Sequence, residues 1–417
     1  IRDINALTLG TVSTGALTVN SGNLTVGGVL NGTAVSLNSS GTINEGPAGS
    51  ITATTLTGHS AGATSLAGVN HVGTLGSFTA AGFALTNGQS LAVTGAVDGG
   101  ASTALTTTSG NLAINGAVSG TTTTLKSAGT ISEGAGGYIT AATLTGQSAG
   151  ATTLNGSNHV TNLGSFSAAG FGLTNTQSLP LAGALPGGAS TALTTTAGNL
   201  AINAAVNGTT TTLASAGAIS QGAGGAITAT TLTGHSGGAT TLNGSNHIGT
   251  LGSFTAAGFA LTNAQALTVT GPVSGGTSTT LATTAGNLAI NGAVSGTTTT
   301  LNSAADITEG SGGSITATTL NGSSVGNTTL NQANHIGTLG SFSAANFALT
   351  NAQALSVGGP LTTTGGTGDI SLTTTSGALS VNTAVTGDEV SLTSAGDLAL
   401  GNNVTGTTVN LDSTGNI

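Results

Sequence analysis

The feature that most constrains this chain is a repeat of 88 residues that recurs four times without an insertion. The histidines of the tripeptide Asn-His-Val or Asn-His-Ile mark it, because successive ones are each 88 residues apart: His71, His159, His247 and His335. Such a fixed period indicates an array of like units that stack on one another, and it argues against a domain built around one pocket. We therefore expect one repeat array over residues 1–417, with repeats at 23–110, 111–198, 199–286 and 287–374 and shorter regular coils over 375–417.

A shorter period of about 20 residues lies inside the long one. The sequence numbers of the leucines from Leu17 to Leu105 increase in steps of 20, 19, 19 and 30, and the same steps recur in the later repeats. Residues spaced one coil apart stack on one another in a solenoid. We therefore expect coils of about 19 to 20 residues, with every fourth coil about 30 residues long, around one buried aliphatic column. Its members are Leu37, Leu56, Leu75, Leu125, Leu144, Leu163, Leu213, Leu232, Leu251, Leu301, Leu320 and Leu339.

The composition favours strands over helices for these coils. Gly accounts for 72 of the 417 residues, and only 2 residues are Lys or Arg. Good helix formers are thus scarce, whereas segments such as "NLAIN" and "ALSVN" alternate apolar and polar residues between turn-forming Gly and Asn. Nineteen to twenty residues accommodate three short strands with tight corners. The sequence therefore predicts an all-β fold, a parallel β-helix (β-solenoid) of about 19 coils with small aliphatic side chains inside and Thr and Ser outside.

Charge, hydropathy and cysteine content exclude several classes of function. The formal net charge is −9, and the two basic residues, Arg2 and Lys126, cannot neutralise a row of phosphates, so we expect no nucleic-acid partner. No apolar run approaches the roughly 18 residues of a membrane-spanning helix, so we expect no membrane insertion. The absence of cysteine excludes disulfides and thiolate metal sites. We expect no cofactor.

The coils resemble those of a known family. Segments such as "SGALSVNTAVTGDEVSLTSAGDLALGNNVTG", rich in Gly, Ser, Thr and Asn and free of Cys, are similar to the filamentous-haemagglutinin-like repeats of large secreted bacterial adhesins. The resemblance implies a right-handed β-helix, export through an outer-membrane transporter by two-partner secretion or autotransport, and a location outside the bacterium or on its surface. The family's N-terminal secretion domain is not recognisable, which leaves the export route open. The resemblance brings no catalytic motif.

The function expected from this resemblance is structural. It implies a stalk or filament that presents a binding tip to a host or matrix glycan or protein receptor, and that mediates attachment or biofilm cohesion. Low charge and short side chains favour lateral contacts between solenoids. Both ends lie in coil-like sequence, at "IRDINALTLG" and "LDSTGNI", so we expect the native molecule to continue beyond them or to associate end to end into fibres.

The residues most often linked to chemistry do not form a catalytic or metal-binding pattern. Histidines of successive repeats are expected four coils apart, about 19 Å, which is too far to share a metal ion. Acids occur at Glu45, Glu133 and Glu309, with Gln221 in the third repeat and no second acid at a fixed offset. A glycosidase needs two such carboxyl groups. We therefore predict no catalytic residue and no metal site, and structural or surface roles for the histidines.

The long fourth coil is the one segment for which the sequence suggests a contact surface. Its first copy, "GFALTNGQSLAVTGAVDGGAST" at 82–103, has about ten residues beyond the other coils and is expected on the same side of the solenoid every 88 residues. Binding residues often lie on such excursions from a rigid scaffold. A weak glycan or protein contact would come from Phe83, Asn87, Gln89 and Asp98. The alternative is an extra strand with its Phe packed beneath it.

Two other functions remain open as alternatives. Threonine runs at 121–124, 209–212 and 297–300 lie on expected flat faces, and Thr ladders on such faces resemble ice-binding proteins, although the neighbouring coils do not continue the Thr pattern. A polysaccharide-acting β-helix enzyme is the second, less favoured alternative, because no cluster of Asp residues on adjacent coils is apparent.

Overall fold

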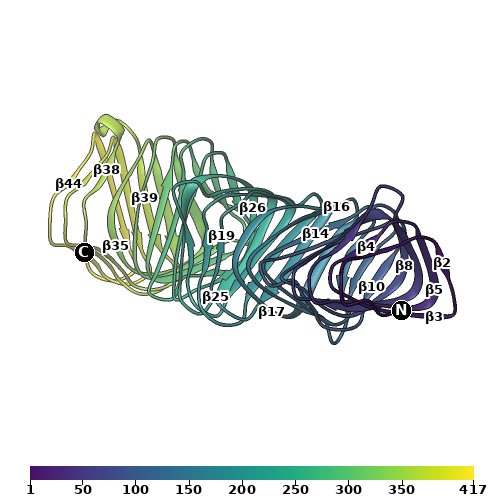
Figure 1. Ribbon diagram of the computed structural model, residues 1–417. Coiled ribbons are helices and arrows are strands. Elements are labelled where there is room, and N and C mark those ends of the chain that lie inside the picture. Colours follow the sequence, from purple (N-terminus) through teal and green to yellow (C-terminus); the bar gives the residue numbers. More distant parts are fainter. The chain divides into compact units, whose positions relative to one another are not determined.

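Parallel strands account for most of the chain. The computed structural model describes residues 1–417, which divide into two compact units, Ile1–Gly208 and Thr209–Ile417. Within each unit, strands about one coil apart in sequence hydrogen-bond to one another in parallel (Figure 1). Each unit is a right-handed parallel β-helix, so the fold class expected from the sequence is confirmed.

The strands are short, and many of them bend at a coil corner. Those of the first unit are β1 (Leu7–Leu9), β2 (Val12–Ser13), β3 (Ala16–Ser21), β4 (Leu24–Val26), β5 (Val29–Ser39), β6 (Ile43–Glu45), β7 (Ser50–Ser60), β8 (Ala63–Thr79), β9 (Gly82–Asn87), β10 (Leu91–Val93), β11 (Val97–Asp98), β12 (Ser102–Thr107), β13 (Leu112–Ile114), β14 (Ala117–Ser127), β15 (Ile131–Glu133), β16 (Tyr138–Ser148), β17 (Ala151–Ser167), β18 (Gly170–Asn175), β19 (Leu179–Leu181), β20 (Leu185–Pro186), β21 (Ser190–Thr195) and β22 (Leu200–Ile202). Strand β23 (Ala205–Ser215) contains the boundary between the units.

The second unit repeats the same succession of strands and adds one 3₁₀ turn, η1 (Thr364–Gly366). Its strands are β24 (Ile219–Gln221), β25 (Ala226–Ser236), β26 (Ala239–Thr255), β27 (Gly258–Asn263), β28 (Leu267–Val269), β29 (Val273–Ser274), β30 (Ser278–Thr283), β31 (Leu288–Ile290), β32 (Ala293–Ser303), β33 (Ile307–Glu309), β34 (Ser314–Ser324), β35 (Thr328–Ala344), β36 (Phe347–Asn351), β37 (Leu355–Val357), β38 (Leu361–Thr363), β39 (Ile370–Thr374), β40 (Leu379–Val381), β41 (Val385–Thr386), β42 (Glu389–Ser394), β43 (Leu398–Leu400), β44 (Val404–Thr405) and β45 (Thr408–Ser413).

Each coil has two short sides and one long side. In the coil that begins at Leu91, β10 and β11 form the short sides and β12 forms the long side. The next coil places β13 on β10, and the two halves of β14 on β11 and β12, so that Leu112 lies beside Leu91 and Leu125 beside Leu105. Side chains alternate between core and solvent along each side, as the period of two in a strand requires.

The expected 30-residue coil does not exist. Phe83 pairs with Thr103 and Leu91 pairs with Leu112, so the segment 82–103 belongs to coils of ordinary length. The expectation was wrong because it placed Leu105 above Leu75. Residue 75 in fact pairs with Val93, since a corner at residues 94–96 carries the chain to the next side of the coil.

The leucines do not form one continuous column. All twelve of them are fully buried. Leu56 pairs with Leu75, but Leu37 pairs with Gly58, one inward position away from Leu56. The coil that starts at Leu37 is therefore longer than the one that starts at Leu56, because its corner at 46–49 contains more of the chain than the corner at 67–69.

The long side of the coil changes place once in every repeat, and we call this rearrangement the side switch. The final part of β8, residues 74–79, is a long side. Two separate strands lie on it in the next coil: Leu75 pairs with Val93 of β10, and Phe78 pairs with Val97 of β11. One long side is thus followed by two short sides with a corner between them.

The opposite change happens in the first part of β8. That part bends at residues 67–69 and forms two short sides, yet the single straight strand β9 lies on both of them. Leu66 pairs with Leu85, and Asn70 pairs with Asn87, with the three corner residues left out of the pairing. Two short sides are thus followed by one long side, and the triangular outline of the coil is inverted.

Equivalent residues of the first two repeats consequently lie on opposite sides of the solenoid. The ladder that starts at Phe83 reaches Leu163 after four coils. The equivalent of Phe83 in the next repeat is Phe171, which pairs with Thr152 on the other side. An 88-residue repeat therefore makes about four and a half turns. The expectation that each repeat returns to the same side every four coils was wrong.

The inversion makes the length of a deletion decisive. Removing residues 23–110, one full repeat, joins Gly22 to Asn111, which follows an equivalent Ser-Gly pair. We expect this variant to keep its strand content and its cooperative thermal unfolding, measured by circular dichroism. Removing residues 23–66, half as many, should abolish cooperative unfolding because it sets coils of mismatched outline against each other without the complete side switch that joins them in the native chain. Equal stability of the two variants would contradict the side switch.

Candidate functional site

The side switch is built around a buried asparagine. Asn70 lies on β8 just after the corner, and its side chain is fully buried. Its Oδ1 accepts a hydrogen bond from the backbone N–H of Ile51 at 2.7 Å. Its Nδ2 donates to the carbonyl oxygens of Leu66 and Gly68, both at 3.3 Å, and to that of Thr86 at 3.1 Å. The amide therefore holds three successive coils together where the corner interrupts the ladder.

A second buried asparagine lies directly above the first. The Oδ1 of Asn87 accepts from the backbone N–H of Val72 at 2.8 Å, and its Nδ2 donates to the carbonyl oxygen of the same residue at 2.9 Å. A side-chain amide has the donor and acceptor of a peptide group. Asn87 thus replaces the strand that β9 does not provide above Val72, and the backbone groups of Val72 stay paired.

Two phenylalanines fill the core where the coil changes shape. Phe78 of β8 and Phe83 of β9 are buried, and their ring centroids are 4.6 Å apart with the planes tilted by 43°. Gly58 lies beside Phe78 in the ladder. A Cβ atom on Gly58 would be 2.2 Å from the carbonyl oxygen of Leu37 and 2.6 Å from the Phe78 ring. Only glycine therefore fits at this position.

A glutamate completes the cluster from the coil below. Glu45, at the end of β6, accepts hydrogen bonds at Oε2 from the backbone N–H of Gly68 and from Nδ2 of Asn70. Burial raises the pKa of the Glu45 carboxyl above its usual 4.5, and these two hydrogen bonds only partly oppose the effect of burial. The other acids at this position behave in the same way: burial raises the pKa of Glu133 and of Glu309.

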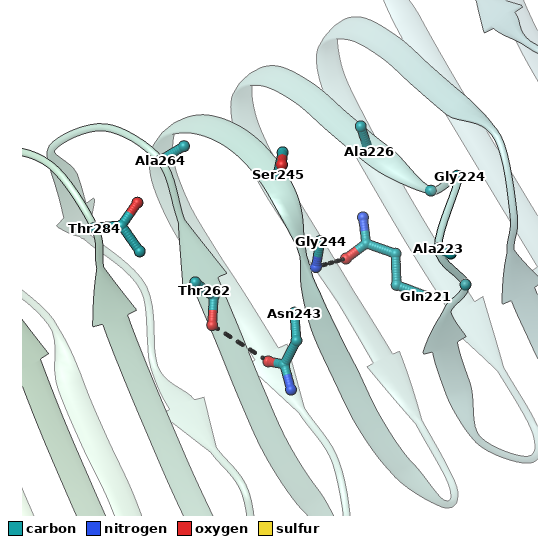
Figure 2. A pocket seen from close by; sticks show the side chains of 12 residues that line it. Gln221, Ala223, Gly224, Ala226, Asn243, Gly244, Ser245, Thr262, Ala264 and Thr284 are labelled. Atoms are coloured by element: carbon teal, nitrogen blue, oxygen red, sulfur yellow. Dashed lines mark hydrogen bonds between the residues drawn. The ribbon is translucent and has the colours of Figure 1, made fainter.

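All four repeats contain this arrangement. The asparagine near the corner is Asn70, Asn158, Asn246 or Asn334, and the one above it is Asn87, Asn175, Asn263 or Asn351. The phenylalanine pairs are Phe78–Phe83, Phe166–Phe171, Phe254–Phe259 and Phe342–Phe347. The third repeat differs in one atom, because Gln221 replaces the glutamate; its Oε1 accepts from the N–H of Gly244 at 2.8 Å, as Figure 2 shows.

The histidines singled out by the sequence are exposed and separate from one another. His71 continues the ladder Ser13, Asn31 and Thr52. His159 belongs to a different ladder, which passes through His59. No group of three or more His, Cys, Asp or Glu side chains is placed to hold a metal ion. It is the Asn before each histidine, not the histidine, that takes part in the buried cluster.

Shallow surface grooves follow the histidine ladders. One of about 650 Å³ in the first unit is lined by Asn31, Thr52, His71 and Gln89, together with small neighbours. An equivalent groove of about 810 Å³ in the second unit contains His335 and Gln353. A third, of about 570 Å³, lies over the Gly-rich corner 222–225 (Figure 2). Apart from the imidazoles of His71 and His335, their linings carry no titratable side chain and no aromatic ring.

The contact surface expected on the long coil is largely internal. Phe83 is 1% exposed and Asn87 is fully buried, so neither can touch a ligand. The prediction was wrong for these two residues because the segment forms an ordinary side of the solenoid. Gln89 is half-buried at the groove beside His71, and Asp98 is exposed, where its Oδ1 accepts from the N–H of Gly100 at 3.0 Å.

The threonine runs divide between core and surface. Thr123 points inward and is fully buried, whereas Thr122 and Thr124 point outward. The outward pair is stacked on Thr143 and Thr145 of the next coil, and the hydroxyls of Thr124 and Thr145 are 3.1 Å apart. The coil before them carries Ser102 and Ala104 at these positions.

Comparison with protein-family models, with curated proteins and with solved structures finds no match to this chain. The structure contains no helix long and apolar enough to cross a bilayer. The geometry of the site is that of a set of buried side chains that hold neighbouring coils together.

The role of the corner asparagine can be tested against an exposed neighbour. Asn158→Ala leaves the buried N–H of Ile139 without its acceptor and several carbonyls without a donor. We expect it to lower the free energy of unfolding by about 3 kcal/mol, measured by urea denaturation, and to speed hydrogen exchange at Ile139. Asn155→Ala, at the exposed corner of the same strand, is the control and should change little. Equal effects of the two substitutions would contradict the assignment.

Proposed function

We propose that this chain is a structural repeat region of a secreted bacterial cell-surface adhesin, acting as a stalk or filament. In this role the coils bear mechanical load and hold the binding segment at a fixed distance from the cell surface. A segment other than the coils binds the receptor. Attachment to a host or matrix glycan or protein, or cohesion of a biofilm, would be the result. Export through an outer-membrane transporter belongs to the same proposal.

The observation that carries the proposal is which residues stay the same in the four copies. The positions of Asn158, Asn175 and Phe166 hold the same residue in every copy, and all are buried. The outward position of Gln147, by contrast, holds His59, His235 and Ser323 in the other copies. A repeat whose constant residues are mostly those that hold coils together, and whose surface varies at positions other than those of His71 and Gln89, supports a mechanical role more than a binding code.

The rival functions have weaker support. A polysaccharide-cleaving site needs two carboxyl groups that flank one glycosidic bond. Glu133 instead points into the side switch, where it accepts hydrogen bonds from Gly156 and Asn158. An ice-binding face needs a long regular array, whereas the outward threonine columns are two residues long at Thr122 and Thr143 and three at Thr298, Thr319 and Thr338 before other residues replace them. The outward residues His71 and Gln89 recur in all four copies and line one groove, and any contact made by the coils themselves is assigned there.

Side-by-side association of solenoids also fits the surface. Its outward residues are mainly Ser, Thr, Asn and Gly, and two basic and eleven acidic residues are spread over 417 positions. Short uncharged side chains allow close approach, because little charge has to be desolvated. Self-association into fibres, laterally or end to end, therefore belongs to the proposed structural role.

The proposal predicts an inert surface and an extracellular location. Antibody raised against the chain should label intact cells of its source without permeabilisation. The purified chain should show no saturable binding to a glycan array, no thermal hysteresis in ice, and no release of reducing sugar from polysaccharides. Labelling only after permeabilisation would contradict secretion. Glycan binding that is weakened in a His71→Ala, Gln89→Ala double variant would replace the stalk with a contact function.

A further inference from the structure

The glutamate of the side switch has one carboxyl oxygen without a partner. In the repeats that contain Glu45, Glu133 and Glu309, Oε2 accepts two hydrogen bonds. The other oxygen, Oε1, is buried in all three and has no hydrogen-bond partner. A buried acceptor without a donor destabilises the folded chain, so three identical occurrences need a physical explanation.

The third repeat shows what the buried position requires. There Gln221 occupies the site, and its Oε1 accepts from Gly244 N–H and from Asn246 Nδ2, as the carboxylate Oε2 does elsewhere. Its Nε2 takes the place of the unpartnered oxygen and donates to Asn246 Oδ1 at 2.7 Å. Figure 2 shows the Gln221 amide reaching across to the neighbouring coil. The position therefore accommodates a hydrogen-bond donor.

The orientation of the asparagine is fixed, so it cannot turn to supply that donor. In the second repeat, Asn158 Oδ1 accepts from Ile139 N–H at 2.7 Å, and Nδ2 donates to the carbonyl oxygens of Leu154 and Thr174, both at 3.1 Å. Exchanging O and N would place an amino group against the N–H of Ile139. With the asparagine in this orientation, an ionised Glu133 would have two oxygens facing each other with no hydrogen between them.

We propose that Glu45, Glu133 and Glu309 are proton-binding sites, each held as a neutral carboxylic acid whose Oε1–H donates to the Oδ1 of Asn70, Asn158 or Asn334. The proton takes the place of one amide hydrogen of Gln221. When it is lost, the carboxylate oxygen and the asparagine oxygen repel each other, and the side switch of that repeat is loosened. This inference does not depend on the adhesin proposal.

The surroundings of the three carboxyls support the neutral form. Burial raises the pKa of each, and their hydrogen-bond partners are donors without charge. Among the strands packed on Glu133, β13 has no titratable side chain and β17 has only His159, which is exposed. Glu45 lies between β4, which has no titratable side chain, and β8, which has only the exposed His71. Glu309 lies between β31, which has none, and β35, which has only the exposed His335. Asp306, which precedes β33, is half-buried and accepts from Asn327 N–H.

The sign of the pH dependence follows from the raised pKa. Below pH 4.5 the carboxyl is protonated in both the folded and the unfolded chain, and its full contribution to stability is present. As the pH rises through the folded-state pKa, the folded chain must give up the proton and the contribution is lost. The protein should therefore become less stable from pH 4.5 upwards, and most of this loss should come from these three residues.

Carbon-13 NMR of the side-chain carboxyls tests the protonation directly, because the chain has only four glutamates. The fourth, Glu389, is exposed, accepts from Asn410 Nδ2 and lies outside the side switches. We expect the resonances of the three other glutamates to titrate above pH 4.5. Each of the variants Glu45→Gln, Glu133→Gln and Glu309→Gln should remove one of them. Titration of these three carboxyls at or below pH 4.5 would overturn the proposal.

Substitution tests the coupling to stability. Glu133→Gln reproduces the third repeat, so it should fold, raise the urea midpoint at neutral pH and weaken its fall with pH. Gln221→Glu should do the reverse, and if it fails to fold at neutral pH it should recover in acid. Glu389→Gln is the matched exposed control and should change neither value. A lower midpoint for Glu133→Gln at neutral pH, or no change in slope, would contradict the proposal.

Discussion

The structure depends on keeping every buried peptide group hydrogen-bonded while the coil inverts its outline. In a parallel β-helix the coils above and below supply these partners, and a side switch interrupts them at the corner. Asn70 and Asn87 restore the missing bonds with side-chain amides, and the amide of Asn87 bonds both backbone groups of Val72. Phe78 and Phe83 then fill the space that the inversion opens, and Gly58 makes room for them.

The sequence predicts the solenoid but not the inversion, for physical reasons. A step of about 20 residues between leucines is sufficient to indicate stacked coils. This spacing does not distinguish a Leu105 stacked on Leu75 from one that a corner separates from it. The reason is that a coil longer or shorter by two residues still points the same side chains inward. The segment 82–103 therefore resembles one long coil in the sequence. The strand pairing of Phe83 with Thr103 is fixed by contacts between coils, which a spacing of leucines does not contain.

The candidate site, like the inversion, could be predicted from the sequence only in part. The tripeptide Asn-His-Val draws attention to His71, the residue with familiar chemistry, whereas its neighbour Asn70 is the one that is buried and bonded. A signal was present, since Asn at this position and Glu or Gln at a fixed earlier position recur in all four repeats. The partnership of Glu45 with Asn70 became visible only when the fold placed them on neighbouring coils. Gln221, which occupies the glutamate position in the third repeat, then indicates that the carboxyl group acts as a hydrogen-bond donor.

Disulfide trapping tests the inversion most directly, because the chain has no native cysteine. Ala84 and Ala104 are paired on adjacent strands, and paired residues lie about 4.8 Å apart, within the Cα separation that a disulfide allows. A single 30-residue coil would instead place Thr74 beside Ala104. The inversion predicts that Ala84→Cys with Ala104→Cys forms an internal disulfide, and that Thr74→Cys with Ala104→Cys does not. The reverse pattern would contradict it.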